Sequence, residues 1–371
     1  MVTPNKFVQA LSPYEITPQD VWDTDQRRNL LKLDWNEAPY DFEWYKRAAE
    51  TILKDAGILA WYPDYLALEL TKKIADFCKV TVNNLLVFPG SDVALETVCR
   101  TYLTETDVVI TTAPTYDNFA VFVAQTGATL EKIEVIPPHE VTTSRIADQI
   151  ERNRHTKMVY LVNPNNPFGY LIPRDVVESL VGNYPEILFV VDEAYIEFST
   201  SDSLVTLVRD YENLVVSRTF SKAFGLAGLR LGYVCAGEHI LNSLNKIRNG
   251  KNVIMLAQKL GVVALDEIER LYNWVDEVRK AKQMVYRWCD EQSLPYFTSE
   301  ANFVMLKVPD PTAVCTELKA RGIYVRNRDS VLPGYIRVTV GSLVTTKKLL
   351  SELSRSMVVT GKQTPSHIHG L

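Results

Sequence analysis

The sequence predicts an α/β fold in which a mainly parallel, seven-stranded sheet is sandwiched by helices, with a smaller α+β domain beside it. Two observations predict this fold. Short apolar segments rich in β-branched residues alternate with helical segments from residue 84 to residue 237. Beyond them, a long helical region gives way to a compact mixture of strands and helices. We therefore predict an N-terminal arm that joins the small domain (1–40), a large domain (41–245) and a small C-terminal domain (246–371).

The composition is that of an ordinary globular protein. Of its 371 residues 46% are apolar and 23% are charged, and the net charge is −5. A negative net charge disfavours a surface for nucleic acid or for an anionic membrane, since both need a dominant basic patch. The chain shows no signal-peptide pattern, and no apolar run approaches the roughly 20 residues that cross a bilayer. We predict no nucleic-acid partner and no membrane partner.

Cysteine and histidine usage bears on the compartment and on metals. The five cysteines are scattered, odd in number and without a CxxC pair, which predicts buried free thiols in a reducing cytoplasm. His367 and His369 lie in a polar C-terminal tail, where two histidines do not make a metal site. We predict a cytoplasmic protein without a metal centre.

The first part of the chain predicts an irregular arm followed by helices. Prolines punctuate residues 1–32, and the segment 31–42 predicts a short apolar strand that runs into a polar turn. Helical periodicity holds from residue 43 to about residue 56. A WYPDY turn at 61–65 then precedes another helix that ends near Lys79.

The central part of the chain contains the strands of the large sheet. Their continuous apolar, β-branched character is typical of parallel strands that are covered on both faces. In such sheets ligands bind at the carboxyl ends of the strands. The predicted strands are 85–88, 107–112, 130–136, 158–162, 187–191, 213–217 and 231–237.

The last third of the chain predicts one long helical region followed by the small domain. The helical region runs from about residue 257 to residue 291. The small domain then alternates strands with helices, and the last ten residues are polar. Its predicted elements are strands at 302–308, 322–326 and 335–340 and helices at 311–321 and 345–357.

Polar clusters follow the predicted strands, and one of them contains a notable lysine. In SRTFSKAFGLAGLRLG (217–232), Lys222 lies where the strand 213–217 breaks into a predicted helix. Thr219 and Ser221 precede Lys222, and Arg230 follows it, which are groups that a bound phosphate needs nearby. A lysine that bonds to an aldehyde must be desolvated and fixed in place. The other interpretation is a surface lysine at the start of a helix.

Three motifs together carry a family resemblance. They are NPNNPFG (163–169), VVDEAYIEF (190–198) and SRTFSKAFGLAGLRLG (217–232). With them the chain resembles a fold-type I pyridoxal-phosphate (PLP) enzyme. It is most similar to the histidinol-phosphate aminotransferase group of the class I/II aminotransferases, over nearly its whole length. The resemblance implies the fold-type I large domain, PLP as the cofactor, and a transferase of amino groups.

The resemblance also implies roles around the cofactor ring. Lys222 matches the lysine that binds the cofactor aldehyde and later acts as the general base. Asp192 matches the carboxylate beside the ring nitrogen, which must stay protonated for the ring to act as an electron sink. Tyr195 and Asn166 match the partners of the ring 3′-oxygen, and Tyr116 matches the aromatic side chain that stacks on the ring. The expected catalytic residues are Lys222, Asp192 and Tyr195.

The phosphate of the cofactor has its own expected partners. Ser91 and Asp92 open a predicted helix after Gly90, so their backbone N–H groups can face an anion. By the resemblance, Tyr62 reaches the phosphate in the neighbouring subunit, which implies a homodimer. The side chains expected to complete the phosphate site are Thr219, Ser221 and Arg230.

Four residues match positions that bind the substrate in the family. Arg337 in YIRVTVGS matches the arginine that binds the substrate α-carboxylate, and Arg326 matches an arginine that binds a substrate phosphate. Tyr14 and Asn36 match N-terminal residues that line the substrate pocket. The chain departs from the family pattern at Phe168, where a small hydroxyl residue is usual, and at 250–253 (GKNV), where an aromatic residue is usual.

The expected function is a PLP-dependent aminotransferase that moves an amino group from an amino acid, with glutamate as the expected donor, to a keto or aldehyde acceptor. The acceptor can be phosphorylated. The alternatives are a PLP-dependent decarboxylase of a phosphorylated amino acid and an aminotransferase for a sugar or aromatic substrate. A ligand-sensing domain of a transcription regulator is disfavoured, because residues 1–40 leave no room for a DNA-binding module. A NAD enzyme is excluded, since no GxGxxG motif follows a strand.

Overall fold

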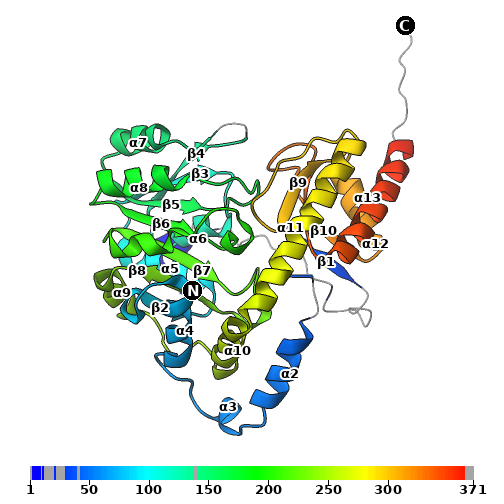
Figure 1. Ribbon diagram of the computed structural model, residues 1–371. Helices are drawn as coiled ribbons and strands as arrows, with labels where there is room; N and C mark the ends of the chain where they lie inside the picture. Colours follow the sequence, from blue (N-terminus) through cyan, green and yellow to red (C-terminus); the bar gives the residue numbers. More distant parts are fainter. Residues whose placement is uncertain are drawn as a thin grey trace.

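The computed structural model describes residues 2–9, 11, 21, 30–39, 42–137 and 140–363, with side chains up to residue 358. Two sheets organise these residues, and helices cover both (Figure 1). The boundaries predicted above for the arm and the two domains stay predictions.

The larger sheet has seven strands in the order β2-β8-β7-β6-β5-β3-β4. Only β8 runs antiparallel to its neighbours, so the sheet is mainly parallel and the predicted fold class is confirmed. The strands are β2 (Leu85–Phe88), β3 (Val108–Ala113), β4 (Thr129–Glu134), β5 (Thr156–Val162), β6 (Leu188–Asp192), β7 (Leu214–Thr219) and β8 (Gly232–Ala236).

Both faces of this sheet are buried because alternate strand residues enter separate cores. On β5, Met158 and Tyr160 belong to one core, together with residues of three helices on that face. Val159 and Leu161 belong to the other core, which continues beneath the second sheet. The helices of the first face are α5 (Ser91–Tyr102), α6 (Asn118–Ala124) and α9 (Glu238–Asn245). Those of the second face include α4 (Leu68–Cys78), α7 (Thr143–Arg152) and α8 (Arg174–Asn183).

The smaller sheet has the order β1-β10-β11-β9. Its first strand comes from near the N-terminus and runs parallel to β10, with Leu31 opposite Ile323. The other three strands are antiparallel to one another. The strands are β1 (Leu31–Leu33), β9 (Phe303–Lys307), β10 (Ile323–Asn327) and β11 (Tyr335–Thr339), and the helices beside them are α12 (Pro311–Ala320) and α13 (Leu343–Gln363).

The long helical region predicted for 257–291 is two helices, α10 (Met255–Asp266) and α11 (Ile268–Glu291). Glu267 separates them with φ −99° and ψ 33°, outside the helical range. The break lets α10 pack against α4 and α2 (Glu43–Ile52), while α11 packs against α13 and β9. Apolar periodicity continues across Glu267, so sequence pattern alone did not reveal the change of partner.

Two further predictions of helices were wrong in extent. The helix predicted for 43–56 ends at Ile52, and a short helix α3 (Gly57–Ala60) follows. After β7, Lys222 lies in a turn and not at the start of an α-helix, with only a 3-10 turn at Ala227–Leu229 beyond it. Gly225, with φ +70°, closes this turn against the ring of Phe42, a conformation that favours glycine.

The short helix α1 (Lys6–Gln9) completes the described helices. Among the residues that the structure describes, none of the helices has the length and apolar character needed to cross a membrane. Within the same ranges, no group of three or more His, Cys, Asp or Glu side chains is arranged to hold a metal ion.

Candidate active site

The carboxyl ends of β5, β6 and β7 bring the three motifs together. Asp192 is the last residue of β6, and Lys222 follows β7 by three residues. The motif after β5 joins this edge through a hydrogen bond from Asn163 N to the carbonyl of Asp192. Parallel neighbours end at the same edge of a sheet, which is why motifs distant in the sequence converge here.

Asp192 is a buried carboxylate, only 4% exposed. It accepts hydrogen bonds from the hydroxyl of Tyr160 at 3.0 Å and from the backbone N–H of Ala194 at 3.2 Å. The pKa of Asp192 is raised to about 7, mainly by burial and in smaller part by the nearby Asp92, while the bond from Tyr160 opposes the rise. A carboxylate so placed is stabilised by a cationic partner, such as a protonated ring nitrogen.

Lys222 lies half-buried beside this carboxylate. Its ammonium donates to the carbonyl of Trp35 at 2.8 Å and lies 5.8 Å from the centre of the Tyr195 ring. Its positive charge is close enough to Asp192 to favour the ionised carboxylate. The amine is therefore fixed between the edge of the large sheet and the N-terminal segment that follows β1.

Tyr195 is the centre of a buried hydrogen-bond network. Its hydroxyl oxygen accepts from the side-chain amides of Asn36 at 3.0 Å and Asn166 at 3.5 Å. Asn36 has φ +58°, in the left-handed region, and its backbone is held by Thr339 and Asn302. Such a conformation costs free energy in a residue other than glycine and is commonly kept at functional sites.

Arg337 extends this network to the smaller sheet. It donates to the side-chain oxygen of Asn166 at 2.6 Å and to the carbonyl of Asp34 at 2.7 Å. Its Nε is buried and has no hydrogen-bond partner among the residues that the structure describes. The pKa of Arg337 is lowered to about 9, mainly by burial and in smaller part by the charges of Arg328 and Arg326. A buried guanidinium with a spare donor can bind an anionic group of a substrate.

The residues expected at the cofactor phosphate lie around the N-terminus of α5. Asp92 in its first turn accepts from the hydroxyl of Tyr116 at 2.8 Å and from Arg230 at 3.3 Å. Gly90 has φ +91°, and a Cβ there would lie 2.6 Å from the Arg230 guanidinium. The hydroxyl of Thr219 donates to that of Ser221 at 2.9 Å. This cradle of exposed guanidinium, hydroxyls and helix N–H groups, with Ser91 at the start of α5, fits a phosphate.

Among the predicted residues that the structure describes, Tyr62 lies away from this cluster. Tyr62 is 81% exposed, and the ammonium of Lys251 lies 4.9 Å from its ring centre. Tyr14 lies outside the described residues. Arg326 lies on β10 directly opposite Arg337 on β11, so these two arginines share one face of the smaller sheet.

Both departures from the family pattern have a structural correlate. Phe168 is fully buried and packs edge-on against Phe297, with ring centres 4.9 Å apart. In the segment 250–253, a Cβ on Gly250 would lie 2.4 Å from the ring of Tyr65, and Lys251 places its ammonium over the ring of Tyr62. Phe168 is therefore accommodated by packing, and the second departure places a lysine beside Tyr62.

Sequence reasoning missed several residues of the site. The Tyr160 hydroxyl could have been noticed as a polar group within an apolar strand, and a buried hydroxyl needs a partner. The Trp35 carbonyl leaves no sequence signal, because every residue has one. The basic cluster RNR (326–328) is visible in the sequence as a group able to hold one phosphate, but the ion pair of Arg328 with Asp117 was missed.

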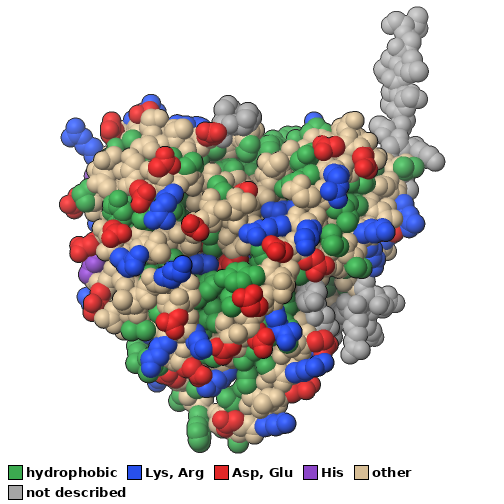
Figure 2. All heavy atoms as spheres, viewed as in Figure 1, with side chains coloured by type: hydrophobic (Ala, Val, Ile, Leu, Met, Phe, Trp, Pro, Cys, Tyr) green, Lys and Arg blue, Asp and Glu red, His purple; other side chains and the backbone are tan. Residues whose placement is uncertain are grey.

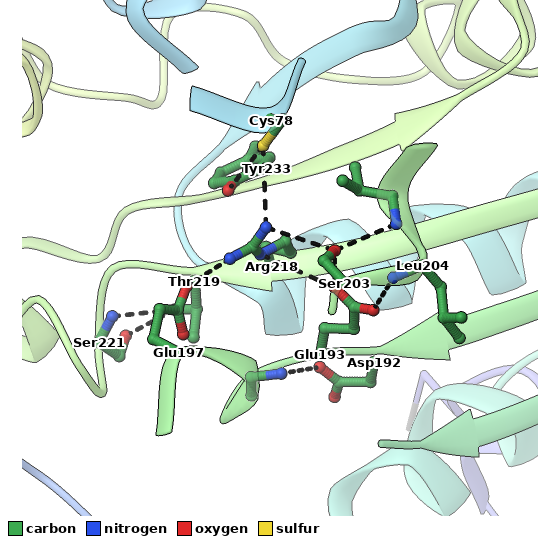
Figure 3. A network of polar contacts seen from close by, with 12 residues as sticks. Cys78, Asp192, Glu193, Glu197, Ser203, Leu204, Arg218, Thr219, Ser221 and Tyr233 are labelled. Atoms are coloured by element: carbon green, nitrogen blue, oxygen red, sulfur yellow. Dashed lines mark hydrogen bonds and ion pairs between the residues drawn. The ribbon is translucent and has the colours of Figure 1, made fainter. Parts of the chain in front are cut away.

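A buried ionic network lies next to Asp192 (Figure 3). Arg218 on β7 donates to Glu197 at 2.7 Å and lies 3.9 Å from Glu193, which directly follows Asp192. Glu193 also accepts from the backbone N–H of Leu204 at 2.6 Å and from the hydroxyl of Ser203. This network ties the end of β6 to β7, and so fixes the two strand ends from which Asp192 and Lys222 come.

Comparisons with known proteins agree on one kind of relative. The family model described as aminotransferase class I and II matches residues 28–353. A dihydroxyacetone phosphate transaminase of Campylobacter jejuni is 35% identical over 352 residues, covering 91% of this chain and 93% of that protein. A histidinol-phosphate aminotransferase of a Geobacillus species is 31% identical, covering 89% and 90%. In structure, histidinol-phosphate aminotransferase from Sinorhizobium meliloti, solved with pyridoxal-5′-phosphate, matches with TM-score 0.87 and 23% identity, covering 97% and 99%.

Proposed function

This chain belongs to the class I and II aminotransferase family, and from that premise we propose that its acceptor is a phosphorylated keto or aldehyde compound, with glutamate as the amino donor. It is a PLP-dependent aminotransferase. The observation that carries the proposal is the pair of arginines, Arg326 and Arg337, facing each other across β10 and β11. Both relatives described above are named for phosphorylated substrates, which supports the same choice.

PLP, when bound, supplies an aldehyde that takes up the amino group and a ring that withdraws electrons from the substrate α-carbon. In our proposal Lys222 would hold PLP through that aldehyde, and its amine would accept and return a proton at the substrate α-carbon. Asp192, supported by Tyr160, holds the proton on the ring nitrogen. Asn166 and Tyr195 are assigned to the 3′-oxygen, and Tyr116 to the ring face.

The remaining cofactor contacts in the proposal are to the phosphate. The guanidinium of Arg230 is assigned to pair with the phosphate charge. In this structure it donates to the carboxylate of Asp92, which also accepts a hydrogen bond from the hydroxyl of Tyr116. Ser91 and Asp92 contribute backbone N–H groups at the start of α5, where the helix dipole favours an anion. Thr219 and Ser221 contribute hydroxyl groups, which already contact each other.

On the substrate side, Arg337 is assigned to the α-carboxylate of the donor and Arg326 to the phosphate of the acceptor. Asn36 contributes to the pocket through its bond to Tyr195. Tyr14 keeps its predicted role on the pocket wall. Transamination is favoured over decarboxylation because the relatives described above are transaminases, and they give the decarboxylase no support.

The proposal includes a homodimer and a cytoplasmic setting. Tyr62 and its neighbours Leu59 and Trp61 are highly exposed apolar side chains, which supports an interface between copies of the chain. Figure 2 shows hydrophobic atoms at this lower tip, over α3. All five cysteines are free thiols, which supports a reducing compartment.

Absorbance spectroscopy of the purified holoenzyme tests this function. We expect a visible band from the cofactor bound to Lys222, which glutamate converts to the pyridoxamine form and a phosphorylated keto or aldehyde compound restores. Release of carbon dioxide from the donor would instead indicate a decarboxylase.

The variant Lys222→Ala tests the assignment of the lysine. It should bind PLP without the lysine-dependent visible band and lose at least about 10⁴-fold in turnover, because both the covalent attachment and the general base are gone. Turnover at the normal rate would refute the role of Lys222.

A further inference from the structure

Three arginines lie in a row on one face of the smaller sheet. Arg326 and Arg337 are directly opposite each other on β10 and β11. The backbone N–H of Arg328 donates to the carbonyl of Tyr335 at 3.0 Å, so the ladder continues for two residues past that pair. Arg328 directly follows β10, and because residues two apart in an extended ladder point to the same face, this bond places Arg328 on the side of Arg326 and Arg337.

Two of these guanidinium groups are buried with donors to spare. Arg328 is 8% exposed and Arg337 is 5% exposed. Among the described residues, the Nε of each is buried without a hydrogen-bond partner. Like charges on adjacent positions of a sheet destabilise it, and buried donors without partners cost further free energy. An anion bound beside these arginines would offset their like charges and accept hydrogen bonds from the unpaired donors.

Arg328 has one ion pair among the described residues. Its Nη1 contacts a carboxylate oxygen of Asp117 at 3.2 Å. The Asp117 side chain is about half exposed, at 48%, whereas that of Arg328 is at 10%. Asp117 directly follows Tyr116 and precedes α6, so the pair links the smaller sheet to the loop that presents Tyr116.

This inference rests on the phosphorylated acceptor proposed above. We propose that Arg328 is a specificity-determining residue that binds the acceptor phosphate through its Nε side, next to Arg326 and Arg337, and that Asp117 holds the guanidinium in place between turnovers. The sequence motifs assign Arg326 and Arg337 but not Arg328. A phosphate carries nearly two negative charges, so it matches several guanidinium groups better than a carboxylate does.

The alternative is that the Arg328–Asp117 pair only joins two parts of the fold. The variants Arg328→Gln and Asp117→Asn distinguish the two interpretations, because each variant breaks the same ion pair. If the pair is only structural, both variants should have the same effect. If Arg328 binds the phosphate, Asp117 competes for the same guanidinium, so removing its charge should strengthen anion binding while removing Arg328 weakens it.

The test uses the holoenzyme and inorganic phosphate as a competitive inhibitor against the acceptor. In Arg328→Gln we expect the inhibition constant for phosphate to rise about 10-fold to 100-fold, as for the loss of a hydrogen bond to a charged group. We expect kcat/KM for a phosphorylated acceptor to fall by a similar factor, mainly through KM, and that for its dephosphorylated counterpart to change less than about threefold. In Asp117→Asn the inhibition constant should fall.

Arg328→Lys keeps the charge without the bidentate geometry, so its inhibition constant should lie between those of wild type and Arg328→Gln. Equal weakening of phosphate inhibition in Arg328→Gln and Asp117→Asn would overturn the inference and leave the proposed function intact. An inhibition constant for phosphate that is the same in Arg328→Gln as in wild type would also overturn the inference and leave the proposed function intact. A wild-type enzyme that neither prefers phosphorylated acceptors nor binds phosphate would refute the proposed acceptor itself.

Discussion

Asp192 is a single residue whose burial lowers the stability of the folded apoprotein. A carboxylate in this position loses its hydration, and two hydrogen bonds compensate only in part, because the pKa still rises to about 7. The cost is removed when a cation binds beside it. In the proposed assignment, the burial cost of Asp192 in the apoprotein is therefore relieved when the ring nitrogen of PLP binds beside it.

The first prediction follows from this pKa. The folded state of the apoprotein binds a proton at Asp192 more tightly than the unfolded state does, so the Asp192 contribution to stability falls as pH rises from about 4 to about 7. Asp192→Asn removes the charge at nearly constant shape. We expect the melting temperature of the apo variant to exceed that of the apo wild type at pH 8, and the difference to shrink at pH 5.

The same variant should lose activity by about 100-fold or more, since it cannot hold the proton on the ring nitrogen. Melting curves at the two pH values, with and without PLP, measure both effects. A stability difference between variant and wild type that does not change with pH would show that Asp192 is ionised throughout this range.

At the scale of the elements, the ends of β6 and β7 are held by the buried network around Arg218. Glu193 and Glu197 are both fully buried or nearly so, and Arg218 lies between them. Burial raises the pKa of Glu193, and the Arg218 charge opposes that rise. Such a network adds little net stability relative to apolar residues, but it becomes costly when one partner is removed.

We predict that Arg218→Met lowers the free energy of unfolding by about 3–5 kcal/mol at pH 8, because two carboxylates are left buried without their cation. The loss should be smaller at pH 5.5. Without the Arg218 charge the folded-state pKa of Glu193 rises further above its unfolded value, and such a contribution to stability falls as pH increases. Urea unfolding at the two pH values measures it.

The triple variant Arg218→Met, Glu193→Gln, Glu197→Gln is the matched control. It removes both buried charges together with their partner, so it should recover most of the lost stability and show no comparable pH dependence. If Arg218→Met alone is as stable as wild type at pH 8, water reaches the buried carboxylates of the network.

At the scale of the whole molecule, one described region is exposed and apolar enough to need a partner. Leu59, Trp61, Tyr62 and Leu66 surround α3, and each is at least 60% exposed. In Figure 1 this region projects from the lower end of the molecule, away from the smaller sheet. A second copy of the chain that covers it would also explain the expected role of Tyr62 in the neighbouring site.

We predict that Trp61→Asp yields monomers with weak affinity for PLP, measured by light scattering and cofactor titration. Tyr62→Phe should stay dimeric and bind PLP about 10-fold more weakly, because only one hydrogen bond to the phosphate is lost. Val344→Asp is the matched control: Val344 is 78% exposed on α13, and this variant should change neither property. A monomeric wild-type protein with full PLP affinity would contradict both the dimer and the role of Tyr62.

The strands of the large sheet could be predicted to within about two residues because buried parallel strands are continuous apolar runs. The meeting of Asp192 and Lys222 at one edge of this sheet could also be predicted, since parallel neighbours end at the same edge, whereas their roles toward the cofactor come from the family resemblance and stay predictions. What could not be predicted depends on tertiary partners. Glu267 breaks a periodic helix because α10 and α11 pack on different elements, and Arg328 meets Asp117 only through the packing of two sheets.

The parallel pairing of β1 with β10 has a consequence for the order of assembly on the ribosome. All seven strands of the large sheet have been synthesised once residue 236 is made, whereas β1 must wait for β10 to emerge. Domains generally fold as their sequences leave the ribosome. Asp192 thus belongs to a sheet that can form early, and Lys222 lies in the turn that follows its strand β7, whereas Asp34 and Asn36 are fixed against Arg337 and Thr339 last. A nascent chain is therefore able to form the proposed cofactor site before the proposed substrate side, so catalytic competence is expected only with the C-terminal third.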